Sequence, residues 1–375
     1  YLSSSMLREG ADASFNIDTF DGAAFQNRLK IVGATGAVSI PGAVTIGSLD
    51  IGHGLSGNLE STAVGQNALD SNATHITTGA LGNTAIGSNA LTALNHSDAD
   101  NNTAVGKDAG DAIVSGFYNT CVGARSLSAA CDDNNTAIGQ EALTAFTGSD
   151  ATVVGSGAAA AASSAAGLTA VGRSALAVVT GTHNTAVGFD AGKTIVAGEN
   201  NTAVGAGALD GATVGAVRNT AVGQAALSGA AVGDNVAIGN AALLGFTGSN
   251  ATAVGANAAV AATSATNLTA VGKGALGACT EGAGNTAVGS AALGLLVGTG
   301  TSAGTGGNYN TALGYATGYQ TTGLRNTLIG TDAGQYATTI DDCIAIGYRA
   351  LQAADSAGDN SDNATGNYNI AVGNY

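Results

Sequence analysis

A pentapeptide of the form Asn-Thr-Ala-Val-Gly is repeated along this chain from Ser61 to the C-terminus. Successive copies are mostly 16 or 17 residues apart, and their 18 glycines are Gly65, Gly87, Gly106, Gly123, Gly139, Gly155, Gly172, Gly188, Gly205, Gly223, Gly239, Gly255, Gly272, Gly289, Gly314, Gly330, Gly347 and Gly373. Such a unit is too short for two helices or a propeller blade, but it matches one turn of a parallel β-coil. The repeat therefore predicts an all-β fold, a parallel β-solenoid or β-roll of about 18 coils with a period of 16–17 residues.

Each position of the repeat has its own residue type. The residue before the glycine is aliphatic in all 18 copies, the residue three before it is always β-branched, and the residue between them is Ala in 15. Side chains alternate between the faces of a strand, so the Thr and the aliphatic residue share one face and the Ala lies on the other. We expect the Thr/aliphatic face to line the interior and the Ala face to pack closely against a second subunit. We also expect the glycine at positive φ and the recurrent Asn in a hydrogen-bonded ladder.

The composition limits how thick the core can be. The chain of 375 residues contains 59 Gly and 78 Ala, no Trp, and only 4% aromatic residues. One coil cannot be stable alone, because ordering it costs about 1.5 kcal/mol per residue and its few large aliphatic side chains return about 2 kcal/mol each. Stacked coils share burial and ladder hydrogen bonds. A core this slim favours lateral association as well.

The pentapeptide divides the chain into two parts. Residues 1–47 lack it and predict a β-rich connector or cap, because they show four short strand-like runs near Ser14–Ile17, Leu29–Val32, Ala37–Ile40 and Val44–Ile46. Residues 48–375 form the repeat shaft, with long insertions near 294–309 and 352–368. The segment Ser156–Gly167 has high helix propensity, but it lies in register with Ala256–Asn267 as part of a block repeated 100 residues later. We therefore expect it to form coil wall.

Charge and hydropathy exclude two classes of partner. The net charge is −15, with the acidic residues scattered, and such an aromatic-poor, negative surface does not favour nucleic acid. The chain has no run of 18 apolar residues, so we expect no membrane insertion.

No group of residues predicts catalysis. The four His residues share no phase of the repeat, and the four Cys residues have no metal-binding spacing. Asp132–Asp133 and Asp341–Asp342 lack the signature of calcium-binding β-rolls, and Cys121 takes an Ala position, where we expect a small buried filler. We expect no enzyme activity, no catalytic residue, no metal and no cofactor.

Tyrosine is concentrated near the C-terminus. Seven of the nine Tyr residues fall in the last 67 positions, close to the two insertions. Exposed aromatic residues on loops are typical of sites that bind glycans or proteins. The candidate receptor-binding residues are Tyr309, Tyr315, Tyr319, Tyr336, Tyr348 and Tyr368. The alternative is that these rings cover the wall of the coils.

The repeat resembles two families. Tandem Asn-Thr-Ala-Val-Gly units are similar to those in the heads of trimeric autotransporter adhesins, although Thr here replaces an aliphatic residue. The variants "NTAVGxxAL", "GNYNTALGYATGYQ" and "NYNIAVGNY" look closer to bacteriophage tail fibre shafts, as does the leader beginning at Phe15. The resemblance implies a left-handed homotrimer in the virion, attached to other tail proteins and binding a host surface glycan or protein receptor. The chain ends inside a repeat, so we expect a fragment.

Three alternatives stay open at this point. A bacterial cell-surface trimeric adhesin head is the first, and it would lie on the cell surface rather than on a virion. An ice-binding β-solenoid is less favoured, because it would need its Thr residues outward. A polysaccharide-degrading tailspike would need paired carboxylates, and no acid recurs at a fixed phase.

Overall fold

The computed structural model describes residues 61–70, 80–211, 215–296, 307–353 and 366–374, together with the backbone of five strands nearer the N-terminus. Those five are β1 (Leu2–Leu7), β2 (Ser14–Phe20), β3 (Phe25–Val32), β4 (Ala37–Ser39) and β5 (Ile51–Gly52). Strands β1 to β4 pair in sequence order as an antiparallel sheet, and β5 pairs antiparallel with β6. Three of the four runs expected in residues 1–47 coincide with β2, β3 and β4, whereas Val44–Ile46 lies outside the described residues.

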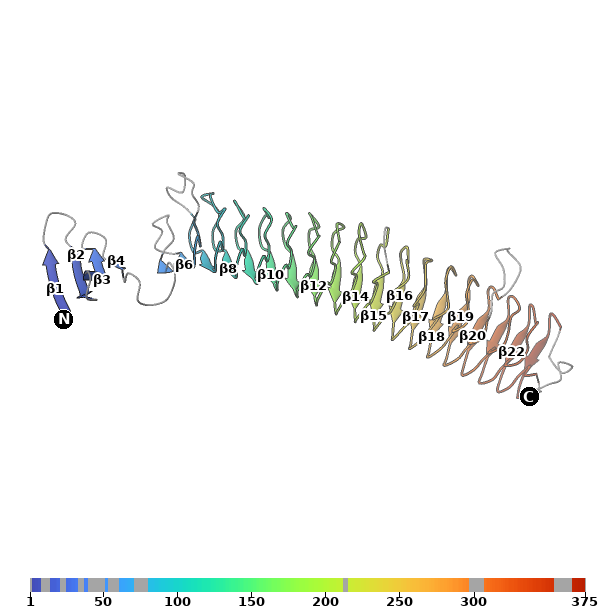
Figure 1. Cartoon of the computed structure of the whole chain (residues 1–375). Helices are drawn as coiled ribbons and strands as arrows, with labels where there is room; N and C mark the ends of the chain where they lie inside the picture. Colours follow the sequence, from blue (N-terminus) through green and yellow to red (C-terminus); the bar gives the residue numbers. More distant parts are fainter. Residues whose placement is uncertain are drawn as a thin grey trace.

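The repeat region is a stack of 18 three-residue strands, each paired in parallel and in register with the next (Figure 1). They are β6 (Thr62–Val64), β7 (Thr84–Ile86), β8 (Thr103–Val105), β9 (Thr120–Val122), β10 (Thr136–Ile138), β11 (Thr152–Val154), β12 (Thr169–Val171), β13 (Thr185–Val187), β14 (Thr202–Val204), β15 (Thr220–Val222), β16 (Val236–Ile238), β17 (Thr252–Val254), β18 (Thr269–Val271), β19 (Thr286–Val288), β20 (Thr311–Leu313), β21 (Thr327–Ile329), β22 (Ile344–Ile346) and β23 (Ile370–Val372). The predicted parallel β-solenoid is thus confirmed.

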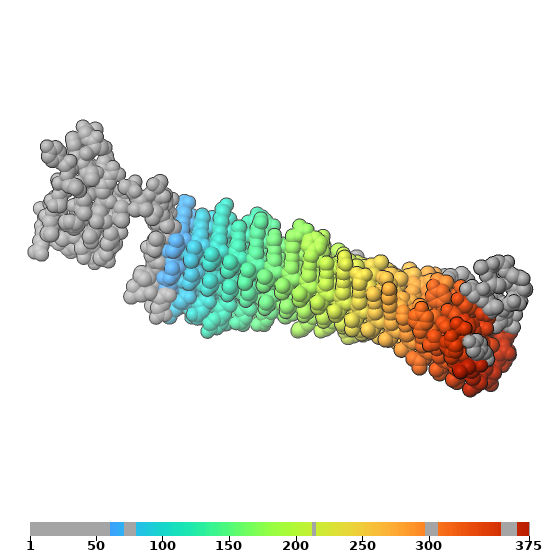
Figure 2. Space-filling view, turned by 90° about the horizontal axis from the view of Figure 1, so that it is seen from below, coloured from blue at the N-terminus to red at the C-terminus, as the bar shows by residue number. Residues whose placement is uncertain are grey.

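The coils form an elongated rod (Figure 2). One strand per coil, at about 4.8 Å between neighbours, gives a rod roughly 80 Å long. The described residues contain no α-helix, and the Ala-rich segment Ser156–Gly167 forms turns of the coil wall, as expected. The two long insertions lie largely outside the described residues.

The assignment of the two strand faces was wrong. In β6 to β22 the middle residue, usually Ala, is buried, and the Thr and the aliphatic residue on either side are partly or fully exposed. Ala104, Ala137 and Ala221 are completely buried within a single chain. The Ala face therefore points into the coil, and no second subunit is needed to cover it. The coil is so thin that a small residue is usual at this position, and Leu328 fits in one coil where the position four after the repeat glycine is Gly334.

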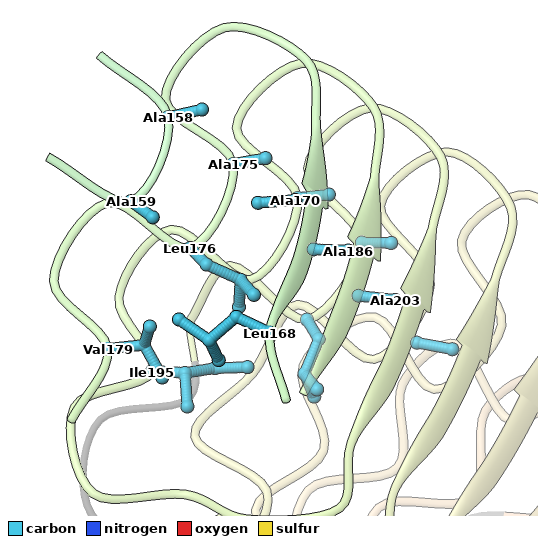
Figure 3. Packing of buried hydrophobic residues seen from close by; sticks show 14 of the residues in the cluster. Ala158, Ala159, Leu168, Ala170, Ala175, Leu176, Val179, Ala186, Ile195 and Ala203 are labelled. Carbon is cyan, nitrogen blue, oxygen red and sulfur yellow. The ribbon is translucent and has the colours of Figure 1, made fainter. Parts of the chain in front are cut away.

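Leucines from the turn after each strand fill the rest of the core. The residue four after the repeat glycine is Leu in most coils, for example Leu143 and Leu176, and these side chains are completely buried (Figure 3). Within one coil, a small side chain at one core position is compensated by a larger side chain at another. Ala159 and Ala162 replace larger residues in one coil, and Leu168 takes the ladder position of the same coil.

The repeat glycines form a column along the rod. Their φ angles lie between 126° and 143°, which confirms the positive φ expected from the sequence. A Cβ atom on almost any of them would overlap the backbone of the corresponding glycine in the next coil. Glycine is therefore required for two reasons: its φ angle is positive, and the backbone of the next coil leaves no space for a side chain.

The predicted Asn ladder is present. The side-chain oxygen of Asn184 accepts the backbone N–H of Asn201 at 3.0 Å, and Asn201 does the same for Asn219. The side-chain amide of Asn201 also donates to the carbonyl of Ala216 at 2.7 Å. Buried backbone groups at this corner are thereby satisfied from coil to coil.

Candidate functional site

An uncharged stripe runs along the outside of the rod. We define the Thr/aliphatic stripe as the first and third residues of strands β6 to β23. It contains only Thr, Val, Ile and Leu, in a chain with 26 acidic and 11 basic residues. Many of its members are exposed large hydrophobic residues, including Ile138 at 39% and Ile238 at 40% exposure. The sequence had placed this stripe inside, so its position is the main feature that the sequence analysis missed.

Two positions in each of 18 strands make this stripe long and narrow. Partly exposed side chains in that number present on the order of 1,000 Å² per chain, similar to the ~800 Å² that each partner buries in a standard protein interface. The aliphatic residue of each strand makes one side of this uncharged stripe apolar, and a large contiguous apolar surface marks interaction sites.

A column of four residues lies at one corner of the last coils. We define the Tyr–Arg–Asp–Tyr column as Tyr309, Arg325, Asp342 and Tyr368, which occupy successive coils before β20, β21, β22 and β23. All four have φ between 56° and 65°, in the left-handed region. Tyr309 and Tyr368 are 64% and 78% exposed. The shared corner conformation therefore projects these side chains outward from neighbouring rungs.

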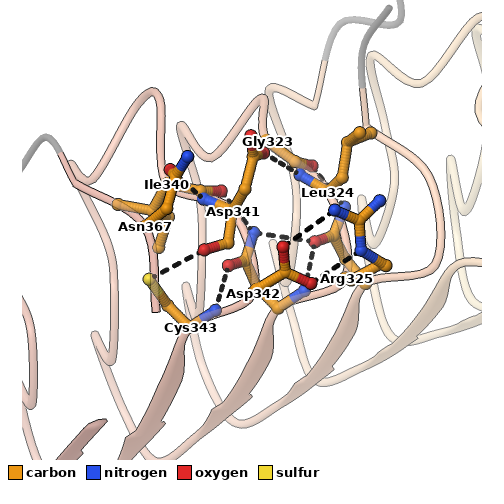
Figure 4. Close-up of polar contacts among 10 residues, drawn as sticks. Gly323, Leu324, Arg325, Ile340, Asp341, Asp342, Cys343 and Asn367 are labelled. Atoms are coloured by element: carbon orange, nitrogen blue, oxygen red, sulfur yellow. Dashed lines mark hydrogen bonds and ion pairs between the residues drawn. The ribbon is translucent and has the colours of Figure 1, made fainter. Parts of the chain in front are cut away.

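Arg325 and Asp342 form a two-point ion pair at the centre of this column (Figure 4). The Nε and Nη2 atoms of Arg325 donate to the two carboxylate oxygens at 2.6 and 2.8 Å. These hydrogen bonds lower the pKa of Asp342 and raise that of Arg325. Paired guanidinium and carboxylate groups hold both side chains in one geometry.

The backbone beneath the column is fixed by a neighbouring carboxylate. Asp341 Oδ1 accepts the backbone N–H of Leu324 at 2.7 Å, and Asn367 Oδ1 accepts the N–H of Asp341 at 3.1 Å (Figure 4). Asp341 is thus a structural residue. One sequence signal could have found the column, since all four of its members directly precede the Asn or Cys of a ladder position.

The other candidate tyrosines divide into two groups. Tyr315 and Tyr348 each follow a repeat glycine and are exposed, and the Arg349 guanidinium lies 4.9 Å from the Tyr348 ring centre. Tyr319 and Tyr336 are only partly exposed. The Tyr319 ring lies directly against Gly294 of the preceding coil, so it covers the wall. Four of the six candidates therefore point outward at the corners of the rod, and their role in receptor binding stays a prediction.

The histidines among the described residues are not grouped into a site. His96 and His183 are exposed and far apart in the repeat, while His53 and His75 lie outside the described residues. Within the described part of the chain, no three His, Cys, Asp or Glu side chains are placed to hold a metal ion.

The cysteines are core residues. All four are free and buried, and Cys121 fills an Ala position of the strand, as expected. Burial raises the pKa of Cys121 well above its usual range and that of Cys131 to about 12. These thiols are therefore poor nucleophiles in the folded chain.

Comparison with known proteins identifies no relative. No family model matches the chain, and neither a curated protein nor a solved structure is similar to it. Across the described residues, no helix has the length and apolar character needed to cross a bilayer.

Proposed function

We propose that this protein is a structural fibre whose chains associate through the Thr/aliphatic stripe, and that it is a trimeric bacteriophage tail fibre shaft used in host attachment. The main support for this proposal is the Thr/aliphatic stripe, which is uncharged and faces outward on all 18 strands. A rod with a core of Ala and single Leu residues gains little stability per coil, and covering the stripe with other copies would bury further apolar surface.

A three-fold arrangement accounts for the shape of the stripe. Each chain has one straight stripe, and three parallel chains would turn these stripes toward a common axis, where identical rungs meet. The resemblance to phage tail fibres and adhesin heads supports the same number of chains. The interface expected from the sequence therefore moves from the Ala face to the Thr/aliphatic face.

Recognition of the host would then fall to outward side chains near the C-terminal coils. The Tyr–Arg–Asp–Tyr column, with Tyr315 and Tyr348 on the other side of the strands, offers aromatic rings and hydrogen-bonding groups to a surface glycan or protein receptor. Attachment to other virion tail proteins and location in the virion are part of this proposal. A bacterial cell-surface adhesin head would use the same surfaces.

The oligomeric state tests the assembly. Light scattering should give a particle of three times 35.7 kDa. The variant Ile138→Lys/Ile238→Lys places two charges on the stripe at equivalent rungs, and we expect it to dissociate the trimer. The matched control Gln140→Lys/Asn240→Lys adds the same charges two residues further along each coil, beyond the stripe, and should remain trimeric. A wild-type monomer would refute the assembly, and so would a trimer in the stripe variant.

The receptor claim needs a separate test. Labelled trimer should bind host cells, and a combined Tyr309→Ala/Tyr368→Ala variant should bind them less while keeping its trimer mass. Unchanged binding would exclude the column as the receptor site.

Ice binding is a second candidate, because one observation now favours it. The sequence analysis disfavours ice binding because it expects the Thr residues to be buried. In the structure, however, the Thr residues face outward at a regular spacing of about 4.8 Å. A trimer would cover this array, so the two functions make opposite predictions. A monomer that shows thermal hysteresis would support ice binding, whereas a trimer without hysteresis would exclude it.

A further inference from the structure

A small, shallow pocket lies near the other end of the rod, away from the Tyr–Arg–Asp–Tyr column. It has a volume of about 210 Å³ and is lined by Asp98, Asp100, Phe117 and Tyr118. Asp98 and Asp100 precede β8, and the two aromatic residues precede β9, so adjacent coils supply the two halves. The sequence analysis did not single out any of these four residues.

The aromatic half has two walls. The rings of Phe117 and Tyr118 lie 5.3 Å apart at an angle of 83°, and Tyr118 is 57% exposed. Both residues are held from the backbone, because the Phe117 N–H donates to Asp133 Oδ1 at 3.0 Å and the Tyr118 N–H donates to the Asp100 carbonyl at 3.0 Å. Two neighbouring rings at right angles can form two walls of a partial cage, in which a cation contacts their π faces.

The other half carries negative charge. Asp100 Oδ1 accepts the backbone N–H of Leu81 at 2.6 Å, which fixes the carboxylate, and Asp98 Oδ1 accepts the Ser97 hydroxyl at 3.0 Å. His96 lies beside Asp98: its Nδ1 accepts the Asp98 backbone N–H at 3.3 Å and lies 3.8 Å from the Asp98 carboxylate. Among the described residues, neither carboxylate is paired with a Lys or Arg.

We propose that this pocket binds a methylated ammonium group, such as the choline head group. Its carboxylates supply the opposite charge, and its rings supply the apolar, electron-rich surface that a quaternary ammonium prefers. Two carboxylates are too few ligands for Ca²⁺, which takes six to eight oxygens. The volume is below the ~300 Å³ typical of sites for larger ligands, which favours a head group over an oligosaccharide. This inference does not depend on the proposed fibre function.

Titration of the whole protein with choline, followed by saturation-transfer NMR and calorimetry, tests the proposal. The neutral isostere 3,3-dimethylbutanol is the control ligand, and Nε-trimethyl-lysine is a second arm that separates a free head group from a modified side chain. We expect choline to bind in the millimolar range, at least about five-fold more tightly than the isostere. Stronger binding of trimethyl-lysine than of choline would keep the ammonium chemistry but assign it to a protein side chain.

Two variants locate the site. Tyr118→Ala removes one exposed wall, and Asp98→Asn removes one charge while keeping the shape, so each should weaken choline binding about three-fold or more. Phe189→Ala and Asp150→Asn change exposed residues elsewhere on the rod, and these variants should bind choline like the wild type. Equal binding of choline and its isostere would overturn the proposal, as would normal choline binding by Tyr118→Ala or no binding by the wild type.

Discussion

Leu328 fills the space that Gly318 leaves open in the core. A Cβ atom built on Gly318 would lie 2.7 Å from Cδ1 of Leu328. Most coils have the opposite arrangement, with Ala in the strand and Leu four residues after the repeat glycine. The two positions therefore share one volume, and the chain fills it from either side.

This exchange can be tested by swapping the residues. Leu328→Ala should lower the free energy of unfolding by about 2–4 kcal/mol, because it leaves a cavity in the coil. Adding Gly318→Leu should recover at least about 1 kcal/mol, since Leu227 and Leu243 already stack at this position in consecutive coils. Denaturant unfolding of the single and double variants measures both changes. A double variant less stable than Leu328→Ala alone would contradict the shared volume.

The glycine column predicts a sharp contrast within one coil. In Gly205→Ala the new Cβ would lie 2.5 Å from the carbonyl oxygen of Gly223, at a φ of 132°. We expect a loss of more than about 2 kcal/mol or a failure to fold. Gly207→Ala is the control, because its Cβ meets only the end of the Asp210 side chain at 3.4 Å, and Ala225 and Ala241 already occupy the same position in the next coils. Thermal unfolding compares the two, and similar melting temperatures would refute this explanation of the column.

Removing a single side-chain amide from the Asn ladder should destabilise the fold. Asn201→Ala removes the oxygen that accepts the Asn219 N–H and the amide that donates to Ala216. Because these groups are buried, we expect a loss of about 1–3 kcal/mol in the free energy of unfolding. Asn240→Ala removes an exposed amide with one hydrogen bond to Gln224, and its effect should stay within about 0.5 kcal/mol. Equal effects in urea unfolding would show that the ladder adds no stability.

Asp210 predicts a pH dependence of stability. Burial raises the pKa of its carboxyl, and the neighbouring Asp190 raises it further. The folded state therefore holds this proton more tightly than the unfolded state, so ionisation of Asp210 destabilises the fold as pH rises through the folded pKa. Asp210→Asn should raise the melting temperature at pH 7, and the gain should shrink as the pH falls through the folded pKa and vanish below the unfolded pKa of about 3.9. Melting curves between pH 3 and pH 8 measure this, and a gain that does not change with pH would contradict it. Asp150→Asn, at an exposed corner, serves as the control.

The sequence predicted the coiled fold but not which face of each strand is buried. Repeat spacing gave the strands, the positive φ of Gly205 and its equivalents, and the Asn ladder, because each depends on local backbone chemistry. Alternation showed which residues share a face, but it could not say which face is buried. Aliphatic residues are usually buried, which favours Val204 and its equivalents as the interior. The small residue recurring at Ala203 and its equivalents is the better indicator, since the leucine four residues after the repeat glycine leaves space in most coils for little more than a methyl group.

The outward sites depend on contacts between coils. Tyr309 and Tyr368 are 59 positions apart in the sequence, and the long insertions between repeats hide the fact that only two coils separate them. Arg325 and Asp342 could be placed between them only after every residue had been assigned to a rung. The pocket near Tyr118 was missed for the same reason, because its two halves come from different coils.

The glycine column sets the length of the rod in equal steps, one for each repeat. Because each glycine meets the backbone of the next at a fixed separation, every inserted repeat adds the same increment of length, about 4.8 Å. Copying the block that spans 100 residues would therefore lengthen the rod by about 29 Å without disturbing any other rung. Gene duplication could therefore change the length of the rod by whole repeats, while the surfaces at its two ends stay the same.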